Sequence, residues 1–541
     1  MNRTDLNTQS AGILKEARRR RTFAIISHPD AGKTTLSEKL LLYGGAVTLA
    51  GSVTAKKAQR DTASDWMELE KKRGISVSST VLRFEYDGFK LNLLDTPGHR
   101  DFSEDTYRVL MATDAAVMVI DAGKGIESQT RKLFHICGRR GIPVFTFINK
   151  MDLPPRDPLG LIDQLENILG LQAFPVTWPI GGGRDFRGIY DRLENSIHLF
   201  KRTPSGQYRA PVSVHSLRDS RAEEIVGEEL YGKLREEVEL LDTVAGSFDR
   251  SLVRAGIVSP VFFGSALNNF GVELLLKNFL NFSTPPTPRS AQNGPVSIES
   301  PEFSGFVFKV QTNMNPRHRD RMVFMRVCSG KFDREMKMRH QRLGREIRLS
   351  NSHNLFGNRR ETLNTAYPGD IVGFVSRDDF KAGDTLSTSG DIIYNEIPRF
   401  APEHFAFIRN PAPSNYKSFR KGIEHFLAED LVQAFTLPDH PDPLPLLGAV
   451  GPLQFEVLQY RLREEYGAES KLETMPWKCL RWVETGVSKK ELKEAIPYGA
   501  AIGRDSLGRR VILFSETWSA EHFAGENPEV KLLESPSGSS L

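Results

Sequence analysis

The stretch SHPDAGKTT, residues 27–35, decides the fold of the first part of the chain. The apolar run FAII precedes it, and the following TTLSEKLLLYGG predicts a helix that ends at glycine. A strand, a tight loop and a helix are the context that a phosphate-binding loop requires, because backbone N–H groups and the positive helix end face the phosphates. The usual first glycine of such a loop is Ser27 here. The stretch therefore predicts a nucleotide site but does not identify the nucleotide.

The loop offers ligands for phosphate and for a metal ion. We expect the backbone N–H groups from Asp30 to Thr34 to surround the phosphates and Lys33 to reach the outer ones. The Thr34 hydroxyl is expected to bind Mg²⁺. The candidate nucleotide-binding residues of this loop are Ser27, His28, Pro29, Asp30, Ala31, Gly32, Lys33, Thr34 and Thr35.

A second motif, LNLLDTPGH, places an aspartate at the end of another apolar run. Asp95 is expected to hold Mg²⁺ through a water, and the Gly98 N–H can bind a γ-phosphate. The candidate residues of this motif are Asp95, Thr96, Pro97, Gly98 and His99.

Two further motifs identify the base. IPVFTFINKMD ends in Asp152, whose carboxylate can accept hydrogen bonds from both the N1–H and the 2-amino group of guanine, whereas adenine offers neither donor. VFFGSALNN places Ser265 and Ala266 where backbone N–H groups can bind the guanine O6. The candidate residues are Asn149, Lys150, Met151, Asp152, Ser265 and Ala266. Four such motifs in this order, on strand ends of one alternating α/β region, predict a P-loop domain that binds GTP and GDP.

Composition sets the broad class of the protein. The 541 residues exceed what a single core holds, and 26% charged with 39% hydrophobic residues is the balance of a globular protein. No apolar run approaches the roughly 20 residues of a membrane helix, and the N-terminus lacks the apolar core of an export signal. Three cysteines without metal-site spacing fit a reducing compartment. We therefore expect a cytoplasmic protein with no membrane partner.

At DTPGH the sequence resembles the translational GTPases, the class of elongation factor G and elongation factor Tu. The resemblance implies that His99 is catalytic, that it orients the attacking water, and that the ribosome drives it into place. KKRGISVSST resembles the first switch segment of that class and implies that Ser76, where most members carry threonine, binds Mg²⁺. Pro29 replaces a more usual aliphatic residue beside the histidine.

Four longer stretches resemble one subfamily, the bacterial class II peptide chain release factors. They are SHPDAGKTTLSEKLLLYGGA, SDWMELEKKRGIS, DTPGHRDFSEDTYRVL and VTWPIGGGRDFRGIYD. The resemblance implies a monomeric, ribosome-stimulated GTPase of translation termination that promotes dissociation and recycling of class I release factors. It also implies contacts with ribosomal RNA and stalk proteins.

The chain as a whole predicts three domains in a multidomain α/β fold. We expect an N-terminal extension over 1–20, a GTP-binding domain over 21–284 with an insert at about 155–258, an antiparallel β-barrel over 296–396, an α+β sandwich over 397–526 and a loose tail over 527–541. The boundary is the proline-rich NFSTPPTPRSAQNGP. The insert carries Ile225, Leu230, Leu234, Val238 and Leu241 at helical spacing beside a strongly acidic face. That face is either a solvated helix surface or a docking site for a ribosomal stalk protein.

Basic residues concentrate in the predicted barrel. Residues 309–348 hold twelve Lys or Arg and four Asp or Glu, although the whole chain carries a net charge of only +4. This distribution predicts a polyanion-facing surface, with a merely solvated face as the alternative.

Three other functions stay open at this stage. The first is an elongation-factor-G-like translocation or ribosome-protection GTPase, against which the length argues because the chain stops after the third domain. The second is a metabolic phosphotransferase, for which we find no second set of acid, base and nucleophile. The third is a nucleic-acid-binding scaffold that uses GTP only for order, against which the intact Lys33, Thr34, Asp95 and His99 argue.

Overall fold

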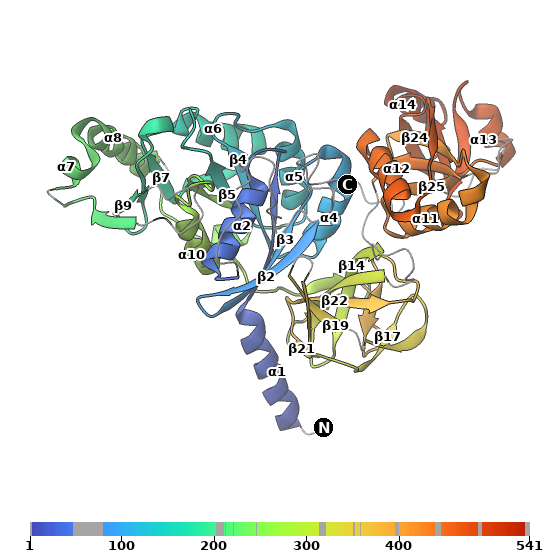
Figure 1. Cartoon of the computed structure of the whole chain (residues 1–541), viewed down its shortest axis with the longest axis horizontal. Helices are drawn as coiled ribbons and strands as arrows, with labels where there is room; N and C mark the ends of the chain where they lie inside the picture. The colour runs from blue at the N-terminus through green and yellow to red at the C-terminus, as the bar shows by residue number, and fades with distance from the viewer. Residues whose placement is uncertain are drawn as a thin grey trace.

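The computed structural model describes residues 3–46, 79–201, 210, 212–219, 221–244, 246–312, 321–349, 352–356, 359–394, 400–438, 445–484 and 489–535. Figure 1 shows three bodies. A central α/β body extends leftward into an insert, an antiparallel sheet lies below it, and a third body lies to the right. We refer to them as the first domain (α1 to α10), the second domain (β14 to β23) and the third domain (β24 to β31).

The first domain alternates strands and helices. Its elements before the insert are α1 Arg3–Arg18, β1 Arg20–Ser27, α2 Lys33–Tyr43, β2 Thr80–Tyr86, β3 Phe89–Asp95, the 3₁₀ helix η1 Arg100–Phe102, α4 Ser103–Met111, β4 Ala115–Asp121, α5 Ser128–Arg139, β5 Val144–Asn149, α6 Pro158–Leu169 and β6 Gln172–Pro175. After the insert come α9 Arg250–Arg254, β11 Val258–Phe263 and α10 Val272–Phe282.

One seven-stranded sheet organises this domain, in the order β2-β3-β1-β4-β5-β11-β6. Only β2 runs antiparallel to its neighbour, and the other pairs are parallel. The strands are apolar on both faces because helices cover both sides. Side chains of α2 and α10 pack with Phe23, Ile25 and Val117 on one face, and those of α4, α5 and α6 pack with Ala24 and Ile26 on the other. This sandwich fixes the loops at the carboxyl ends of the strands.

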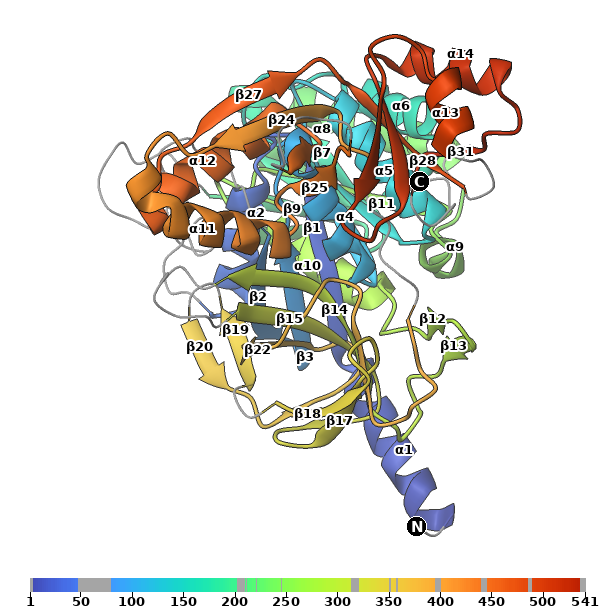
Figure 2. The same ribbon diagram turned by 90° about the vertical axis from the view of Figure 1, so that its right-hand side faces the viewer.

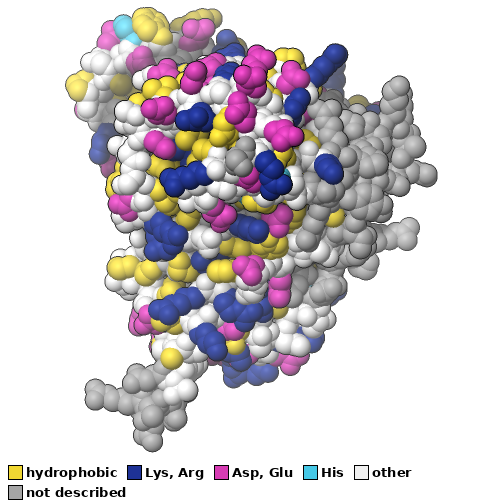
Figure 3. All heavy atoms as spheres, turned by 90° about the vertical axis from the view of Figure 1, so that its left-hand side faces the viewer, with side chains coloured by type: hydrophobic (Ala, Val, Ile, Leu, Met, Phe, Trp, Pro, Cys, Tyr) yellow, Lys and Arg dark blue, Asp and Glu magenta, His cyan; other side chains and the backbone are white. Residues whose placement is uncertain are grey.

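The insert forms a four-stranded antiparallel sheet with a helical hairpin. Its elements are β7 Thr177–Ile180, η2 Gly183–Asp185, β8 Gly188–Asp191, β9 Ser196–Phe200, β10 Val212–Ser216, α7 Ala222–Val226 and α8 Glu228–Val244. The chain breaks the expected single helix at Gly227, which has φ 95°. Leu234, Val238 and Leu241 are buried as predicted, and the exposed side of α8 is acidic. Figure 3 views this side of the molecule and shows acidic and basic side chains interspersed on it.

The second domain is built on one curled antiparallel sheet, a half-barrel, in the order β18-β17-β23-β14-β15-β22-β19-β20, with β16 and β21 as a separate pair. The strands are β14 Ser304–Thr312, β15 Arg321–Ser329, β16 Phe332–Asp333, β17 Lys337–His340, β18 Arg345–Arg348, β19 Ser352–Phe356, β20 Arg359–Thr362, β21 Thr365–Ala366, β22 Ile371–Ser376 and β23 Thr385–Ser387. The chain reaches it through a hairpin of β12 Arg289–Ala291 and β13 Gly294–Val296, which lies in the boundary segment expected to be irregular. Figure 2 shows this sheet beneath the first domain, with α1 projecting beside it.

The third domain places two helical layers on one eight-stranded sheet, in the order β27-β24-β26-β25-β29-β30-β28-β31. Its elements are β24 His404–Arg409, η4 Pro413–Asn415, α11 Tyr416–Ala428, β25 Gln433–Thr436, β26 Leu446–Ala449, α12 Pro452–Tyr466, β27 Lys471–Met475, β28 Cys479–Val483, α13 Lys489–Ala495, β29 Ala501–Asp505, β30 Arg510–Phe514, α14 Thr517–Glu526 and β31 Leu532–Leu533. The fold class is the predicted α+β arrangement.

The expected loose tail is wrong over its first part. β31 pairs with β28, Leu532 opposite Val483 and Leu533 opposite Trp482, and Val530 is buried. These few apolar side chains close the edge of the sheet, and the polar residues around them in the sequence gave no strand pattern. Residues 536–541 of the predicted tail lie outside the described residues.

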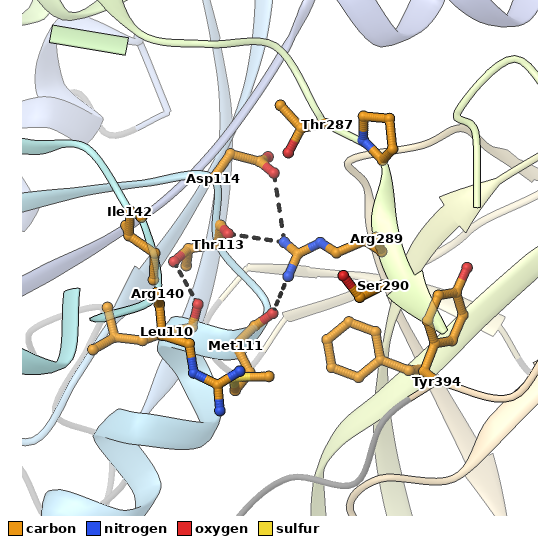
Figure 4. Close-up of a pocket in the computed structure, with 13 residues that line it drawn as sticks. Leu110, Met111, Thr113, Asp114, Arg140, Ile142, Thr287, Arg289, Ser290 and Tyr394 are labelled. Atoms are coloured by element: carbon orange, nitrogen blue, oxygen red, sulfur yellow. Dashed lines mark hydrogen bonds and ion pairs between the residues drawn. The ribbon is translucent and has the colours of Figure 1, made fainter. Parts of the chain in front are cut away.

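Buried ion pairs join the first two domains. Asp114, between α4 and β4, accepts two hydrogen bonds from the Arg326 guanidinium of β15, at 2.9 and 2.7 Å, and both side chains are only 2% exposed. Figure 4 shows Arg289 reaching from β12 to Met111, Thr113 and Asp114 across the same joint. The arginines of this joint thus pair with groups of the first domain, and Arg289 also lines the pocket that Figure 4 shows.

The turn Tyr367–Asp370 makes a second contact at this joint. The Arg20 Nε donates to the Asp370 carboxylate at 2.7 Å, and Asn92 donates to the Gly369 carbonyl at 3.1 Å. Gly369 has φ +102°, and a Cβ there would lie 2.5 Å from Pro286 and 3.1 Å from Arg20. Only glycine fits this close approach.

Part of the predicted basic surface is therefore interior. Lys309 and Arg326 are buried against the first domain. The exposed basic side chains lie around the β17–β18 hairpin and comprise Arg334, Lys337, Arg339, Arg342, Arg345 and Arg348.

Candidate nucleotide-binding site

The four predicted motifs meet at one edge of the first domain's sheet. β1, β3, β5 and β11 run parallel, and the motif residues follow their carboxyl ends. In open α/β sheets this edge is where ligands bind, because it gathers loops and helix N-termini. Two of the loops touch directly, since a Cβ on Gly98 would lie 3.5 Å from the Pro29 Cα.

The phosphate side of the site is built around Lys33. Lys33 begins α2, is buried, and donates from Nζ to Asp95 Oδ1 at 2.7 Å. The residue for the phosphates and the residue for the metal ion therefore face one spot. Gly32 has φ +98°, and a Cβ there would lie 2.2 Å from Asn149 Nδ2. The loop thus needs glycine both for its conformation and for its closeness to the base-side motif.

Asn149 connects the phosphate side to the base side. Its amide nitrogen donates to the Ala31 carbonyl and its amide oxygen accepts from the Ala266 N–H, both at 2.8 Å. One buried side chain thereby fixes three loops that are distant in sequence. The amide orientation follows from these two partners.

Asp152 lies where it can receive a base. The side chain is partly exposed, and Oδ2 accepts from Asn268 Nδ2 at 3.0 Å. Asn268 also donates to Ser265 Oγ at 3.0 Å, so Asp152 and the Ser265 loop are tied together. Sequence reasoning missed Asn268, although it stands three residues after Ser265 in a motif already singled out.

Lys150 connects the loop after β1 to the end of β4. It has φ 68°, and its Nζ contacts both the Asp30 carbonyl and Asp121 Oδ2, the latter at 2.8 Å. Burial raises the pKa of Asp121, but the hydrogen bonds from Lys150 and from the Gly123 N–H outweigh it, so the pKa lies below the ordinary value. Asp121 was also missed, and its position at the end of β4 was the available signal.

His99 lies at the margin of the site, 37% exposed. Its Nδ1 lies 3.3 Å from the Asp101 backbone nitrogen and 3.4 Å from Asp101 Oδ1. On the opposite loop, His28 Nε2 lies 3.2 Å from Glu127 Oε1, a partner that the sequence did not suggest. The two predicted histidines thus have separate acidic neighbours.

The other predicted residues lie beside those already described. Thr34 and Thr35 lie in the first turn of α2, and Thr96 Oγ1 donates to the Ile25 carbonyl at 2.7 Å. Met151 is buried, and its N–H donates to Gly264 at 3.1 Å. Ser76 lies outside the described residues, as do residues 71–78 of the first switch segment and the stretch SDWMELE.

Family models match successive parts of the chain. The Elongation factor Tu GTP binding domain matches residues 18–285, Elongation factor G domain 2 matches 302–389, and "Class II release factor RF3, C-terminal domain" matches 394–524. The first of these is the model of a GTP-binding domain, and the edge described above lies within its matched range. The basic strands and the C-terminal α+β body thus fall in recognised domains.

Whole-length relatives agree with these matches. The chain is 52% identical over 523 residues to "Peptide chain release factor 3" of Gloeobacter violaceus, covering 96% of this chain and 98% of that protein. It is 51% identical over 520 residues to the protein of the same name from Nostoc punctiforme, covering 96% of each. A solved structure from Thermus thermophilus superposes with a TM-score of 0.68 at 20% identity, covering 90% of this chain and 72% of that one, which supports the fold.

Among the described residues, no helix has the length and apolar character needed to cross a membrane.

Proposed function

The chain belongs to the release factor 3 family of translation-termination GTPases, and we propose that it hydrolyses GTP on ribosomes that have released their peptide. There it promotes departure of a class I release factor, acting as a cytoplasmic monomer. The observation that carries the proposal is the 52% identity along 96% of the chain, including the C-terminal domain match. That match favours termination over the elongation-factor-G-like alternative.

GTP binds at the edge where Lys33 and Asn149 gather the loops. In this proposal the Lys33 ammonium leaves Asp95 for the outer phosphates, and the backbone N–H groups of Asp30 to Thr34 bind the inner ones. Asp152 selects guanine, and the Ala266 region binds the guanine O6. The Thr34 hydroxyl and the Asp95 carboxylate are the hard oxygen donors that Mg²⁺ prefers, and Mg²⁺ supplies charge neutralisation at the phosphates when bound.

His99 acts on the water that attacks the γ-phosphate. Phosphoryl transfer depends chiefly on positioning and charge stabilisation, so one orienting side chain can set the rate. The partial exposure of His99 allows a surface of the ribosome to reach it. We infer that binding to the ribosome moves this ring toward the phosphates.

Two surfaces are proposed for the ribosome. The exposed arginines and lysine around β17–β18 form a positive surface suited to ribosomal RNA. The acidic side of α8 on the insert suits a stalk protein.

The test is GTP turnover on ribosomes halted after peptide release with a labelled class I release factor still bound. We expect hydrolysis on ribosomes only, with GTP-dependent departure of the labelled factor. His99→Ala should lower the ribosome-stimulated rate by about 100-fold or more, since it removes an orienting group. Its matched control is His135→Ala, because His135 is exposed on α5 away from the motif loops.

Two outcomes would contradict the proposal. Hydrolysis without departure of the labelled factor would mean that the substrate complex is wrong. Equal stimulated rates in His99→Ala and His135→Ala would remove the catalytic role of His99.

A further inference from the structure

The third domain contacts the segment after His99 through the Asp101 carboxylate and the Phe102 ring. Helix α12 of the third domain begins directly after Gly451, and its N-terminal turn points at η1, the segment after His99. The Asp101 carboxylate of η1 is buried and accepts from the Leu453 N–H at 2.7 Å. Phe102 packs with Leu453 and Val457 beside this bond. In Figure 1, α12 is the helix of the third domain that lies toward α4.

Asp101 supplies the side-chain acceptor for the N-terminus of a helix in another domain. The first N–H groups of a helix need an acceptor that is not in the helix, and a side chain at the N-cap position usually supplies it. Here the N-cap residue is Gly451, which has no side chain. Its Cα lies so close to Asp101 that a Cβ would stand 2.0 Å from the carboxyl carbon. The negative charge also favours the positive end of α12.

The second oxygen of the same carboxylate faces His99. Asp101 Oδ1 lies 3.4 Å from His99 Nδ1, and the Asp101 backbone nitrogen lies 3.3 Å from the same atom. Nδ1 can accept from the backbone N–H or donate to the carboxylate, and each choice fixes what Nε2 presents to the site. The position of the Asp101 side chain therefore bears on both the orientation and the tautomer of the ring.

We propose that Asp101 is a positioning residue for His99, and that the N-terminus of α12 holds it in place. Seating of the third domain then sets the rate of GTP hydrolysis. If the third domain shifts, the Leu453 N–H leaves Asp101, and the carboxylate is free to rotate away from His99. This inference rests on the proposed role of His99 in hydrolysis.

Neighbouring contacts make α4 a point where all three domains meet. Lys309 of the second domain donates to Ser79 at 2.8 Å and lies 3.6 Å from Asp105 of α4. Arg108 of α4 lies 3.5 Å from Asp430 of the third domain. Movement of the third domain is thus transmitted to α4 and to the η1 segment together.

The experiment measures ribosome-stimulated hydrolysis in Asp101→Asn, Asp101→Ala and Gly451→Ala. Gly451 has φ −150°, which alanine adopts, so Gly451→Ala acts by pushing Asp101 from the other domain. We expect all three to lower kcat about tenfold or more, in the range for a displaced orienting group. The KM for ribosomes and the Kd for a fluorescent GTP analogue should stay within about twofold, which a folding defect would not permit.

The matched control and a double variant separate the contact from general damage. Gly525→Ala is the control, because a Cβ there meets nothing within 4 Å in the same domain. In an Asp101→Ala background, Gly451→Ala should have little further effect, since the three nearest atoms to its Cβ belong to the Asp101 carboxylate. Wild-type kcat in both Asp101→Asn and Asp101→Ala would overturn the inference.

Failure of the proposed function has a different signature. If ribosomes do not stimulate the wild-type protein, the proposed function fails. The same variants are then compared by single-turnover hydrolysis without ribosomes, with His99→Ala as the reference. If Asp101→Asn lowers the single-turnover rate as much as His99→Ala does, Asp101 positions His99 in that reaction. If the rate of Asp101→Asn equals the wild-type rate, the positioning role is overturned.

Discussion

The two ends of one parallel sheet serve opposite purposes. At the carboxyl ends of β1 and β5, polar side chains face a site that a ligand can enter, as Asp152 shows by its partial exposure. At the other end, Arg20 begins β1 and Asp114 precedes β4, and both are buried in ion pairs with the second domain. The same strands therefore present one polar edge at the proposed nucleotide site, the open edge, and one polar edge paired with a neighbouring domain, which we call the closed edge.

The difference teaches what a buried charge indicates. Lys33 and Asp95 lie close enough to hydrogen bond, yet each has a proposed task with another group. Arg326 Nη2 donates to both oxygens of Asp114, so no ligand lies between the two side chains. Charges at the first edge should control binding, and charges at the second should control stability.

The largest effect is expected at the closed edge. Asp114→Asn removes the charge that compensates the buried Arg326 guanidinium, which typically costs about 3–5 kcal/mol. Chemical unfolding should show this loss, while the Kd for GTP stays unchanged. Asp391→Asn, an exposed carboxylate in the second domain, is the control and should unfold as the wild type does. If Asp114→Asn instead weakened GTP binding without lowering the free energy of unfolding, Asp114 would act in binding and not in stability.

At the open edge we expect a smaller effect, on GTP affinity and not on the free energy of unfolding. Asp152→Asn cannot accept from both guanine donors, so the affinity for GTP should fall about 100-fold, near the upper range for hydrogen bonds to a charged group. Xanthosine triphosphate should gain relative to GTP, and the free energy of unfolding should barely change. Competition binding measures the ratio, with the exposed Asp163→Asn as control. Unaltered preference for GTP would exclude Asp152 from base recognition.

The smallest effect is a pH dependence at the closed edge. Burial raises the pKa of Asp370, but Arg83 and Arg20 lower it more, so that it lies below the ordinary 3.8. A depressed carboxyl pKa stabilises the folded protein above pH 3.8, and this contribution is lost as the pH falls through the folded value. One such group adds at most about 1.4 kcal/mol per pH unit to the slope.

The check is the slope of unfolding free energy against pH in the acid range. Asp370→Asn should show a shallower slope than the wild type at the same pH values. An identical slope in the two proteins would mean that Asp370 does not keep its charge through the pairs with Arg20 and Arg83.

The sequence predicted which loops meet at the open edge because its signals are local. A strand, a glycine turn and a helix start lie within about a dozen residues, and their backbone geometry dictates where Lys33 and Gly32 go. Asp121 and Asn268 were missed because their roles depend on Lys150 and Asp152, which come from other strands. The α7–α8 break was missed because a glycine inside a helical pattern does not by itself show that it adopts a positive φ, as Gly227 does. The β31 strand was missed because its pairing with β28 outweighed the local pattern.

By itself the sequence determined the order of the three domains, the nucleotide edge and the choice of guanine, because these follow from short motifs and periodicity. Only the tertiary structure decided the rest. It paired Arg20 with Asp370, 350 positions away, and placed the N-terminus of α12 on Asp101, 352 positions before Leu453. Such contacts arise because buried charges and helix ends must find partners wherever the packed domains provide them, and no local pattern records which partner that is.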